Sequence, residues 1–355
     1  MDTVGIGMVG SGFMGLTYSE SLSKHVKGAR LAAVTGGKRA GALAAEYGVP
    51  ALLSLEALLA RPDVDAVILA TPDQLHCAQT EQAAAAGKHV LVEKPMAPSV
   101  AHCDRMIAAC RAAGVNLAVV QTERFRTLTR RAKEMIDGGA IGSLWMLRTI
   151  SSFPIGVTRD IIANRTWLND RAGGGMFMNI ASHNTDFLLW LTGGPARRVF
   201  AQVNTFSDLP SPAQSVMAQI GFAGGVMGQM WISSEFPPPG FPSSEVRFQV
   251  VGSQGLLDFE NFEYLDLGKG QNWERVFTPQ RFDYFKEPKS PIRLEPHIRV
   301  VQEFVDSIRE RRRPSVAGEE GRAAIELCEA CLISARTGQA VDLPLQGPAV
   351  TPGIS

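Results

Sequence analysis

The chain has 355 residues, of which 45% are hydrophobic and 20% are charged, so it is long enough for two domains and is not disordered by composition. Lys plus Arg number 35 and Asp plus Glu number 35, which gives a formal net charge of zero. A neutral chain without a block of like charges is a poor ligand for nucleic acids and anionic membranes, so we expect neither as a partner.

The segments that address a chain to membranes or to the secretory route are not evident. No run of 18 apolar residues is present, and the first residues lack the basic and apolar regions of a secretory signal. Five cysteines in a chain of this length do not form a disulfide scaffold. Cys328 and Cys331 form a CxxC inside a helical run, with no second Cys or His pair nearby. We therefore expect a cytoplasmic protein with reduced thiols and no metal site.

In chain order, the first third alternates short β-rich runs with Ala-rich helical stretches. This alternation, with continuously apolar strands, indicates a parallel sheet covered on both faces. The expected strands are residues 4–9, 30–35, 66–70, 89–92 and 115–120, and the expected helices are 13–25, 39–47, 55–60, 74–86 and 100–113.

The first predicted strand runs into a GxGxxG sequence, residues 10–15, that opens the first predicted helix. Gly10 permits a tight turn, Gly12 lets a pyrophosphate approach the backbone, and Gly15 lets helix and strand pack closely. The phosphate then meets free N–H groups at the positive end of the helix. The motif sits in a strand–helix context, so it predicts a dinucleotide site rather than an ordinary glycine turn.

The end of the second predicted strand bears on the choice of cofactor. An NAD site typically has Asp or Glu about 20 residues after the glycines to hold the ribose 2′-hydroxyl, and here residues 35–39 (TGGKR) contain no carboxylate. Thr35, Lys38 and Arg39 could receive a 2′-phosphate, and Gly36 leaves room for it. In the alternative interpretation, Lys38 and Arg39 merely begin an exposed helix. NADP is favoured, and NAD stays open.

After a further predicted helix at residues 129–138, the character of the chain changes. Longer strands and turns predict an α+β domain with a mostly antiparallel sheet, and two helices close the chain. The expected strands are 144–153, 197–206, 214–222, 226–233 and 245–251, and the expected helices are 181–191, 296–312 and 318–337.

Lys94 stands at the carboxyl end of the fifth predicted strand in the sequence Glu93-Lys94-Pro95. Open α/β sheets bind ligands at this edge. Pro95 restrains the backbone of Lys94, and the peptide bond between them is a candidate for the cis form. Taken alone, the tripeptide is equally consistent with a surface lysine before a loop proline.

Three motifs in order resemble the Gfo/Idh/MocA family of oxidoreductases: residues 70–76 (ATPDQLH), 86–90 (AGKHV) and 93–95 (EKP). The likeness continues over nearly the whole chain, at residues 124–125, 138–142, 173–175, 183 with 186, 190–191 and 334–344.

The resemblance implies two domains. One is a Rossmann domain, a doubly wound parallel sheet, over residues 1–121; the other is an α+β domain with a large open sheet over 122–355. Residues 296–337 are candidates to pack back on the first domain. The resemblance also implies a homodimer or homotetramer, because the face of this sheet often forms the oligomer interface in the family.

The resemblance also assigns roles to residues. Lys94 matches the family lysine that binds the reacting hydroxyl, and His183 matches the family histidine, which suits a proton carrier. We expect burial and the positive nicotinamide to lower the pKa of Lys94. A core or capping role is the alternative for His183. Together with the glycine loop, the resemblance predicts these cofactor-binding residues: Gly10, Gly12, Phe13, Met14, Gly15, Thr35, Gly36, Lys38, Arg39, Thr71, Pro72, His76, Glu93 and Lys94.

Two positions depart from the family pattern. Many members have Asp four residues before the histidine, where this chain has Asn179, which can position a hydroxyl but cannot take its proton. Tyr18 stands near where many members have His on the first helix.

Four further residues are candidates to line a substrate cleft, with ordinary packing or surface pairing as an equal alternative: Arg124, Arg159, Arg165 and Trp167.

The resemblance implies hydride transfer between NAD(P) and a ring secondary alcohol or ketone of a sugar, glycoside or cyclitol. A reductase of a small carbonyl compound or a dihydrodiol dehydrogenase is the enzymatic alternative. A dinucleotide-binding sensor without catalysis is the alternative of another class, and the presence of both Lys94 and His183 argues against it.

Overall fold

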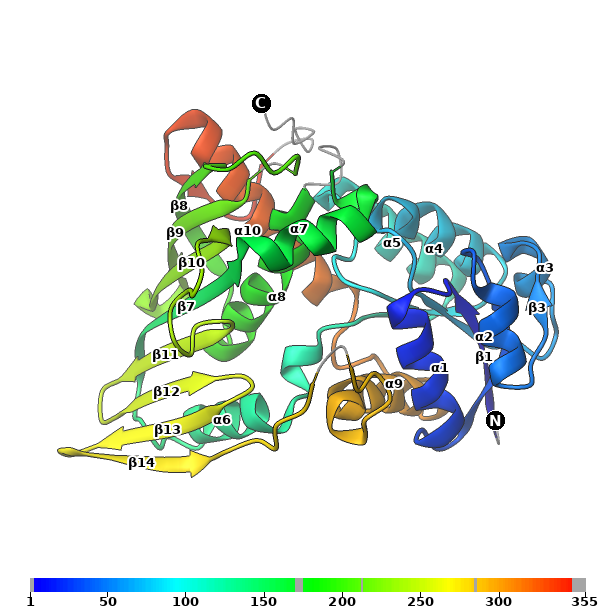
Figure 1. The fold of residues 1–355 in the computed structure, drawn as a ribbon, viewed down its shortest axis with the longest axis horizontal. Helices are drawn as coiled ribbons and strands as arrows, with labels where there is room; N and C mark the ends of the chain where they lie inside the picture. Colours follow the sequence, from blue (N-terminus) through cyan, green and yellow to red (C-terminus); the bar gives the residue numbers. More distant parts are fainter. Residues whose placement is uncertain (1–2, 170–174, 212, 284–285, 347–355) are drawn as a thin grey trace. The chain divides into compact units, whose positions relative to one another are not determined.

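The computed structural model describes residues 3–169, 175–211, 213–283 and 286–346 (Figure 1). Contacts between Cα atoms divide the chain into two compact units. The first combines Met1–Phe125 with Phe282–Arg322, and the second combines Arg126–Arg281 with Ala323–Ser355. Residues 296–337 were predicted as candidates to pack back on a first domain that ends at residue 121, and the contacts place Phe282–Arg322 in the first unit.

The first unit is built on a parallel sheet, as predicted. Within the described residues it has six strands in the order β3-β2-β1-β4-β5-β6. The order reverses between β1 and β4, which is where doubly wound sheets leave a crevice for a ligand at their carboxyl edge. The strands are β1 (Val4–Val9), β2 (Ala29–Thr35), β3 (Ala51–Leu52), β4 (Ala66–Leu69), β5 (His89–Val92) and β6 (Leu117–Val119).

The crossover segments between these strands are helical. Several of the helices end at glycine, and at the end of α5 Gly114 has the left-handed conformation (φ +65°) that favours this residue. The helices of the first unit are α1 (Phe13–Lys24), α2 (Ala40–Glu46), α3 (Leu55–Leu59), α4 (His76–Ala85), α5 (Val100–Ala113) and α9 (Pro291–Arg309), with 3₁₀ turns η1 (Asp73–Leu75) and η2 (Thr122–Arg124).

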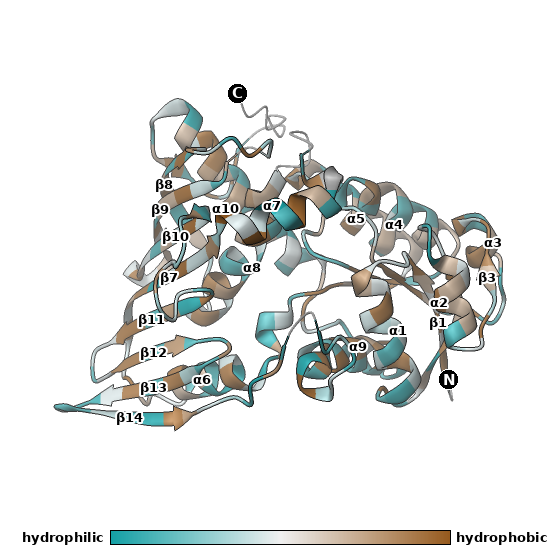
Figure 2. Ribbon diagram, viewed as in Figure 1, coloured by the Kyte–Doolittle hydropathy of each residue, from teal (hydrophilic) through white to brown (hydrophobic). Residues whose placement is uncertain are grey.

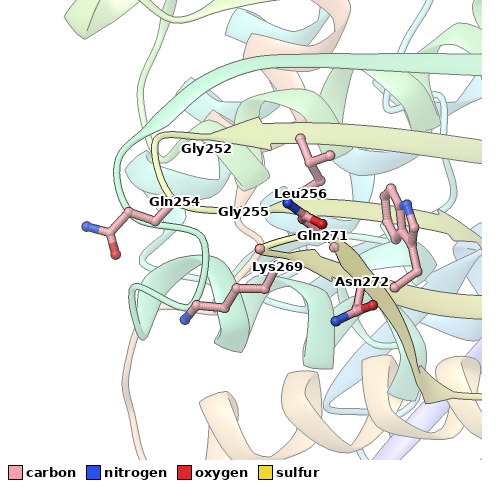
Figure 3. A pocket seen from close by; sticks show the side chains of 10 residues that line it. Gly252, Gln254, Gly255, Leu256, Lys269, Gln271 and Asn272 are labelled. Atoms are coloured by element: carbon pink, nitrogen blue, oxygen red, sulfur yellow. The ribbon is translucent and has the colours of Figure 1, made fainter.

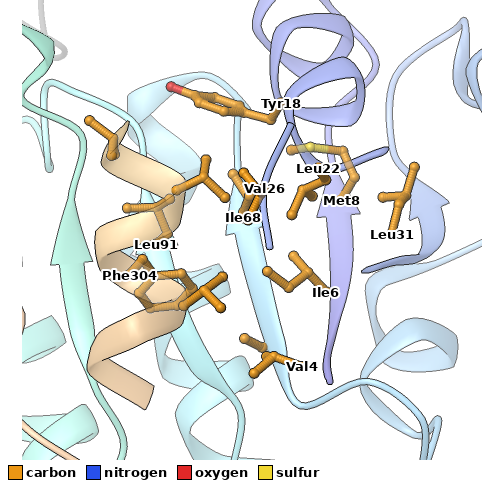
Figure 4. Close-up of a cluster of buried hydrophobic side chains, with 14 of the residues drawn as sticks. Val4, Ile6, Met8, Tyr18, Leu22, Val26, Leu31, Ile68, Leu91 and Phe304 are labelled. Atoms are coloured by element: carbon orange, nitrogen blue, oxygen red, sulfur yellow. The ribbon is translucent and has the colours of Figure 1, made fainter. Parts of the chain in front are cut away.

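Helix α9 completes the core of the first unit although it lies far along the chain. It packs against α1, and its apolar residues share one buried cluster with strand β1 (Figure 4). Figure 2 shows hydrophilic and hydrophobic residues alternating along α9, as expected for a helix with one buried face. Ile6 of β1 and Phe304 of α9 are both almost completely buried. Burying each such side chain contributes about 1.5–3 kcal/mol.

The second unit carries a mostly antiparallel sheet, again as predicted. Among the described residues it has nine strands in the order β14-β13-β12-β11-β7-β10-β9-β8-β15, and only the β7–β10 pair is parallel. The strands are β7 (Leu144–Pro154), β8 (Ala196–Asn204), β9 (Ser215–Phe222), β10 (Met227–Phe236), β11 (Arg247–Gly252), β12 (Leu256–Glu260), β13 (Tyr264–Lys269), β14 (Asn272–Phe277) and β15 (Val341–Asp342).

The helices of the second unit differ in part from those expected. Helix α8 begins six residues earlier than predicted, and α7 and strands β12 to β15 were not anticipated. The sequence of α7 contains Gly156 and several β-branched residues, which have weak helix propensity, so packing rather than propensity decides its conformation. The elements are α6 (Thr127–Asp137), α7 (Ile155–Asn164), α8 (Gly175–Thr192) and α10 (Gly318–Thr337), with η3 (Thr166–Asn169) and η5 (Ala223–Gly225); Gly318–Arg322 of α10 belong to the first unit.

Candidate active site

The glycine loop between β1 and α1 has the geometry that a pyrophosphate requires. Gly10 has φ +112°, and a Cβ on it would lie 2.4 Å from the carbonyl oxygen of Ala70. A Cβ on Gly15 would lie 2.2 Å from the carbonyl oxygen of Gly10, so Gly15 allows the close packing of helix and strand. A Cβ on Gly12 would meet nothing within 4 Å. Open space therefore lies over the middle glycine, where the motif expects a phosphate.

The first turn of α1 follows this open space. Gly12 is the N-cap residue, and it has no side chain to cap the helix. Phe13 and Met14, two of the predicted cofactor residues, are partly exposed in this turn. N–H groups at a helix N-terminus attract anions, and the helix dipole adds to the attraction.

Arg293 is a residue of this region that the sequence analysis missed. Its guanidinium lies 4.3 Å from the centroid of the Phe13 ring and donates a hydrogen bond to Thr17 Oγ1 at 3.0 Å. The side chain is 1% exposed and comes from α9. No local motif marks it, because its partner Thr17 is 276 positions away in the sequence.

The turn after β2 contacts the glycine loop. Ser11 Oγ accepts the backbone N–H of Arg39 at 3.1 Å, and a Cβ on Gly37 (φ +78°) would lie 2.6 Å from that oxygen. The side chains of Lys38 and Arg39 are exposed, and Gly36 has φ +77°. Thr35 is different from what the sequence suggested, because it is 1% exposed and its hydroxyl donates to the carbonyl oxygen of Leu52 at 2.9 Å.

Lys94 is singled out by its exposure. It follows β5, and every other residue from Val90 to Val100, all of them described, is buried, whereas Lys94 is partly exposed. The Lys94–Pro95 peptide bond is cis. Glu93 Oε2 accepts the backbone N–H of Lys94 at 2.9 Å, and Glu93 Oε1 accepts the hydroxyl of Tyr18. The backbone of Lys94 is thus held by its buried neighbour.

His76 connects the two loops that follow β4 and β5. Its Nδ1 lies 3.1 Å from the carbonyl oxygen of Pro95 and 3.3 Å from that of Met96, and its Nε2 lies 3.0 Å from that of Thr71. Burial lowers the pKa of His76 to about 4, against the opposing effect of these carbonyls, so the ring is neutral at pH 7. A neutral imidazole has a single N–H, so His76 can donate a hydrogen bond to the carbonyls of only one of the two loops, although it is packed between both. It was predicted among the cofactor contacts.

Thr71 and Pro72, which precede His76, are partly exposed at the carboxyl edge of the sheet. The hydroxyl of Thr71 donates to Gln79 Oε1 at 2.6 Å, which fixes its orientation. These two residues stay predicted cofactor contacts.

In the second unit, α8 presents Asn179 and His183 together. From Met176 to Leu188, a stretch described throughout, these two are partly exposed and all the others are buried. They lie four residues apart, so they share one face of the helix. The rotation of α8 is fixed by Asn184, whose Nδ2 donates to Thr149 Oγ1 at 2.9 Å and to Ser151 Oγ at 2.8 Å on β7.

Comparisons with known proteins bear on both units. Residues 4–121 match the family described as "Oxidoreductase family, NAD-binding Rossmann fold", and residues 129–258 match the "GFO/IDH/MocA C-terminal domain". An uncharacterised oxidoreductase of Synechocystis sp. is 30% identical over 288 residues, which cover 76% of each chain. The chain belongs to the Gfo/Idh/MocA family of oxidoreductases.

Two proteins with named activities are similar to this chain. The 1,5-anhydro-D-fructose reductase of Ensifer adhaerens is 28% identical over 318 residues, covering 87% of this chain and 89% of the reductase. The aldose-aldose oxidoreductase of Caulobacter crescentus, whose crystal structure contains glycerol, has a TM-score of 0.82 at 25% identity, covering 96% of this chain and all of that one.

The residues predicted to line a substrate cleft differ in their contacts and exposure. Arg159 on α7 forms an ion pair with Asp208, and the pair lowers the pKa of that carboxyl. Arg165 follows α7 and is partly exposed, as is Arg124 in η2. The side chain of Trp167 lies outside the described part of the structure, as do residues 173 and 174 of the glycine triplet; Gly175 begins α8.

A pocket in the second unit is lined by none of the residues predicted for the site. It is formed at the ends of the β11–β12 and β13–β14 hairpins (Figure 3). The Trp273 ring lies over Gly268, with ring atoms 3.1–3.2 Å from where a Cβ would stand. The pocket is lined by Gly252, Gln254, Gly255, Leu256, Gly268, Lys269, Gly270, Gln271, Asn272 and Trp273.

The cysteines of the CxxC are packing residues in this structure. Cys328 and Cys331 on α10 are fully buried, and burial raises the pKa of Cys328 to about 12, which keeps its thiol protonated. Within the described residues, no group of three or more His, Cys, Asp and Glu side chains could hold a metal ion. None of the described helices is long and apolar enough to cross a membrane.

Proposed function

We propose that this protein transfers a hydride between NAD(P) and a ring secondary alcohol or ketone of a sugar, glycoside or cyclitol. The observation that carries the proposal is the partial exposure of Lys94 within an otherwise buried stretch at the carboxyl edge of the sheet. Membership of an oxidoreductase family supports it, as do the sugar reactions for which two of the similar proteins are named.

The residues of the first unit fit a dinucleotide. The space over Gly12, the uncapped first turn of α1 and the close packing at Gly15 suit a pyrophosphate. When bound, the nicotinamide supplies the acceptor or donor of the hydride. Lys38 and Arg39 are exposed beside the glycine loop, and no carboxylate ends β2, so we propose that NADP binds more tightly than NAD.

Lys94 and His183 are the groups that we propose to move the proton. A secondary alcohol must lose its hydroxyl proton as it is oxidised, so an acceptor has to stand within hydrogen-bonding reach. Lys94 Nζ is proposed to bind the reacting oxygen, and the imidazole of His183 to exchange the proton with solvent. Asn179, on the same helical face as His183, is proposed to orient a substrate hydroxyl through its side-chain amide.

A substrate panel tests the reaction. Sugars, glycosides and inositols are incubated with NAD and NADP, and absorbance at 340 nm is followed. We expect at least one ring polyol to reduce NADP faster than NAD at equal concentration. Dihydrodiols are tested with NAD and NADP, and small carbonyl compounds are tested with NADH and NADPH, so that a response confined to these compounds would overturn the ring-polyol proposal. No turnover with any substrate, together with tight dinucleotide binding, would favour the non-catalytic sensor.

Two substitutions test the proton-transfer roles. Lys94→Met and His183→Ala are each expected to lower kcat/KM by about 10²–10⁴-fold, the usual contribution of an acid–base group, with cofactor affinity retained. Lys88→Met is the matched control, because Lys88 is the lysine just before β5, at the opposite end of the strand from Lys94. Wild-type kcat/KM in both test variants would refute the assignment.

We also propose a homo-oligomer that buries the outer face of the nine-stranded sheet. One row of paired residues runs across six described strands, from β10 to β14 through β7. Its members are Met227, Met146, Val251, Leu256, Gly268 and Trp273. Four of them are large and exposed: Met227 is 59% accessible, Met146 40%, Leu256 37% and Trp273 57%. An exposed apolar row of this length on a sheet face is typical of an interface, and a second copy of the chain presents the same row.

A further inference from the structure

Tyr18 stands near where many family members have His, and the motifs assign it no role. It lies on α1, the helix that begins at the glycine loop, and its side chain is fully buried. The ring packs edge-on to His297 of α9, with 5.9 Å between centroids. The labelled side chain in Figure 4 reaches out from α1 with its hydroxyl group at the far end.

The hydroxyl of Tyr18 meets the carboxylate of Glu93, which is 7% exposed at the end of β5. Each carboxylate oxygen of Glu93 has a different hydrogen-bond partner. Oε1 accepts the hydrogen bond from Tyr18, and Oε2 accepts the backbone N–H of Lys94 at 2.9 Å. With both oxygens engaged, the carboxylate cannot rotate without breaking a charge-assisted hydrogen bond in a buried setting.

We propose that Tyr18 is a positioning residue for Lys94 and acts through the Glu93 carboxylate. The proposal rests on the function proposed above, in which Lys94 binds the reacting oxygen. It assigns to α1 a second role besides the phosphate site, because the same helix fixes the backbone from which the Lys94 side chain extends. A small displacement of a catalytic group is costly, since a shift of about 1 Å can lower a rate about 10²-fold.

A double-mutant cycle tests the proposal. Tyr18→Phe removes only the hydroxyl, and Glu93→Ala removes the group through which it acts. We expect Tyr18→Phe to lower kcat about 10-fold, with the cofactor Kd changed less than about twofold. In the Glu93→Ala background the same substitution should lower kcat less than about twofold, because the connection is already lost.

Tyr47→Phe is the matched control. Tyr47 OH donates to Glu20 Oε2 at 2.6 Å, so this variant removes another tyrosine–glutamate hydrogen bond that involves α1, but one away from β5. Its kcat should match that of the wild type. Wild-type kcat in Tyr18→Phe, or an equal kcat loss in both Glu93 backgrounds, would overturn the proposal.

A second measurement needs no substrate and therefore separates this inference from the proposed reaction. Selective ¹⁵N-lysine labelling gives the amide signal of Lys94, assigned with Lys94→Arg, and its hydrogen–deuterium exchange is followed by NMR. Since this N–H is donated to Glu93, we expect exchange at least about 10-fold faster in Tyr18→Phe and unchanged in Tyr47→Phe. Unchanged exchange in Tyr18→Phe would refute the positioning role even if the enzyme turns over sugars.

Discussion

Gly12 and Gly15 lie in the same loop, yet a methyl group added at each meets different surroundings. At Gly15 it would collide with the backbone carbonyl of Gly10, which cannot move aside as a side chain can. At Gly12 it would project into open space, and the backbone there has φ −77°, which any residue adopts. Substitutions at the two positions therefore distinguish an effect on cofactor binding from an effect on folding stability.

Gly12→Ala should fold normally and bind dinucleotide poorly. We expect the free energy of unfolding to stay within about 0.5 kcal/mol of wild type. The new methyl group occupies the space proposed for the pyrophosphate, so the Kd for NADP should rise ~10-fold or more, a loss of about 1.4 kcal/mol of binding energy. Urea unfolding and fluorescence titration measure the two effects, and wild-type affinity would contradict the phosphate assignment.

Gly15→Ala, in contrast, should lower the stability of the folded protein even when no cofactor is present. The overpacked contact with Gly10 is expected to lower the free energy of unfolding by about 1–3 kcal/mol. Urea unfolding without cofactor measures this directly. A Gly15→Ala protein as stable as Gly12→Ala would show that helix and strand can separate at little cost.

The neutral, buried imidazole of His76 makes stability depend on pH. Its pKa of about 4 in the folded protein lies below the value of about 6.5 for an unfolded chain. The unfolded state therefore binds the proton first, and stability present above pH 6.5 is lost as the pH falls toward 4.

His76→Gln should flatten this pH dependence. Between pH 7.5 and 4.5 the wild type should lose about 2–3 kcal/mol more stability than the variant, because glutamine does not titrate. Urea unfolding at the two pH values gives the comparison, in which the acid groups common to both proteins cancel. Equal losses in the two proteins would contradict a neutral His76.

At the scale of the elements, α8 is attached to its sheet by aromatic packing. Phe187 lies 4.5 Å from Phe248 of β11 and 6.1 Å from Phe259 of β12, measured between ring centroids, and all three rings are buried. Such pairs add about 0.5–1.5 kcal/mol beyond the area that they bury. They support the helix that carries Asn179 and His183.

Phe187→Ala should therefore destabilise the second unit by about 3–5 kcal/mol, since it leaves a cavity between helix and sheet. Phe206→Ala is the matched control, because Phe206 is 77% exposed and should change stability by less than about 0.5 kcal/mol. Chemical denaturation followed by circular dichroism measures both. A similar effect of the two substitutions would contradict the packing described for α8.

Sequence patterns predicted the elements of the first unit well, because apolar strands, helix-ending glycines and the GxGxxG loop are local signals. They failed for α7, whose β-branched residues do not favour a helix, and for the early start of α8. Among the site residues, Lys94 is partly exposed, and its role stays a prediction. The buried hydrogen-bonding roles of His76, Thr35 and Arg293 were not predicted, because a local motif does not reveal burial or partners that are distant in the sequence.

For the whole molecule, the apolar row across the outer sheet face bears on assembly. A charge placed in the row would be desolvated at an interface between two copies, at a cost that exceeds any contact it replaces. Met227→Lys is expected to shift the protein to the mass of one chain in analytical ultracentrifugation. Lys269→Gln, at the end of β13, serves as control and should leave the mass unchanged; an unchanged mass in Met227→Lys would place the interface elsewhere.

The late return of the chain to its first unit has a consequence for synthesis. During translation, the strands that bear the glycine loop and Lys94 emerge from the ribosome long before α9, whose Val301 and Phe304 share a buried cluster with Val4 and Ile6. One apolar face of the nascent nucleotide-binding unit therefore stays uncovered until α9, which ends at Arg309, has been synthesised. A premature stop near residue 281 would spare every predicted cofactor contact and still leave a product prone to aggregate.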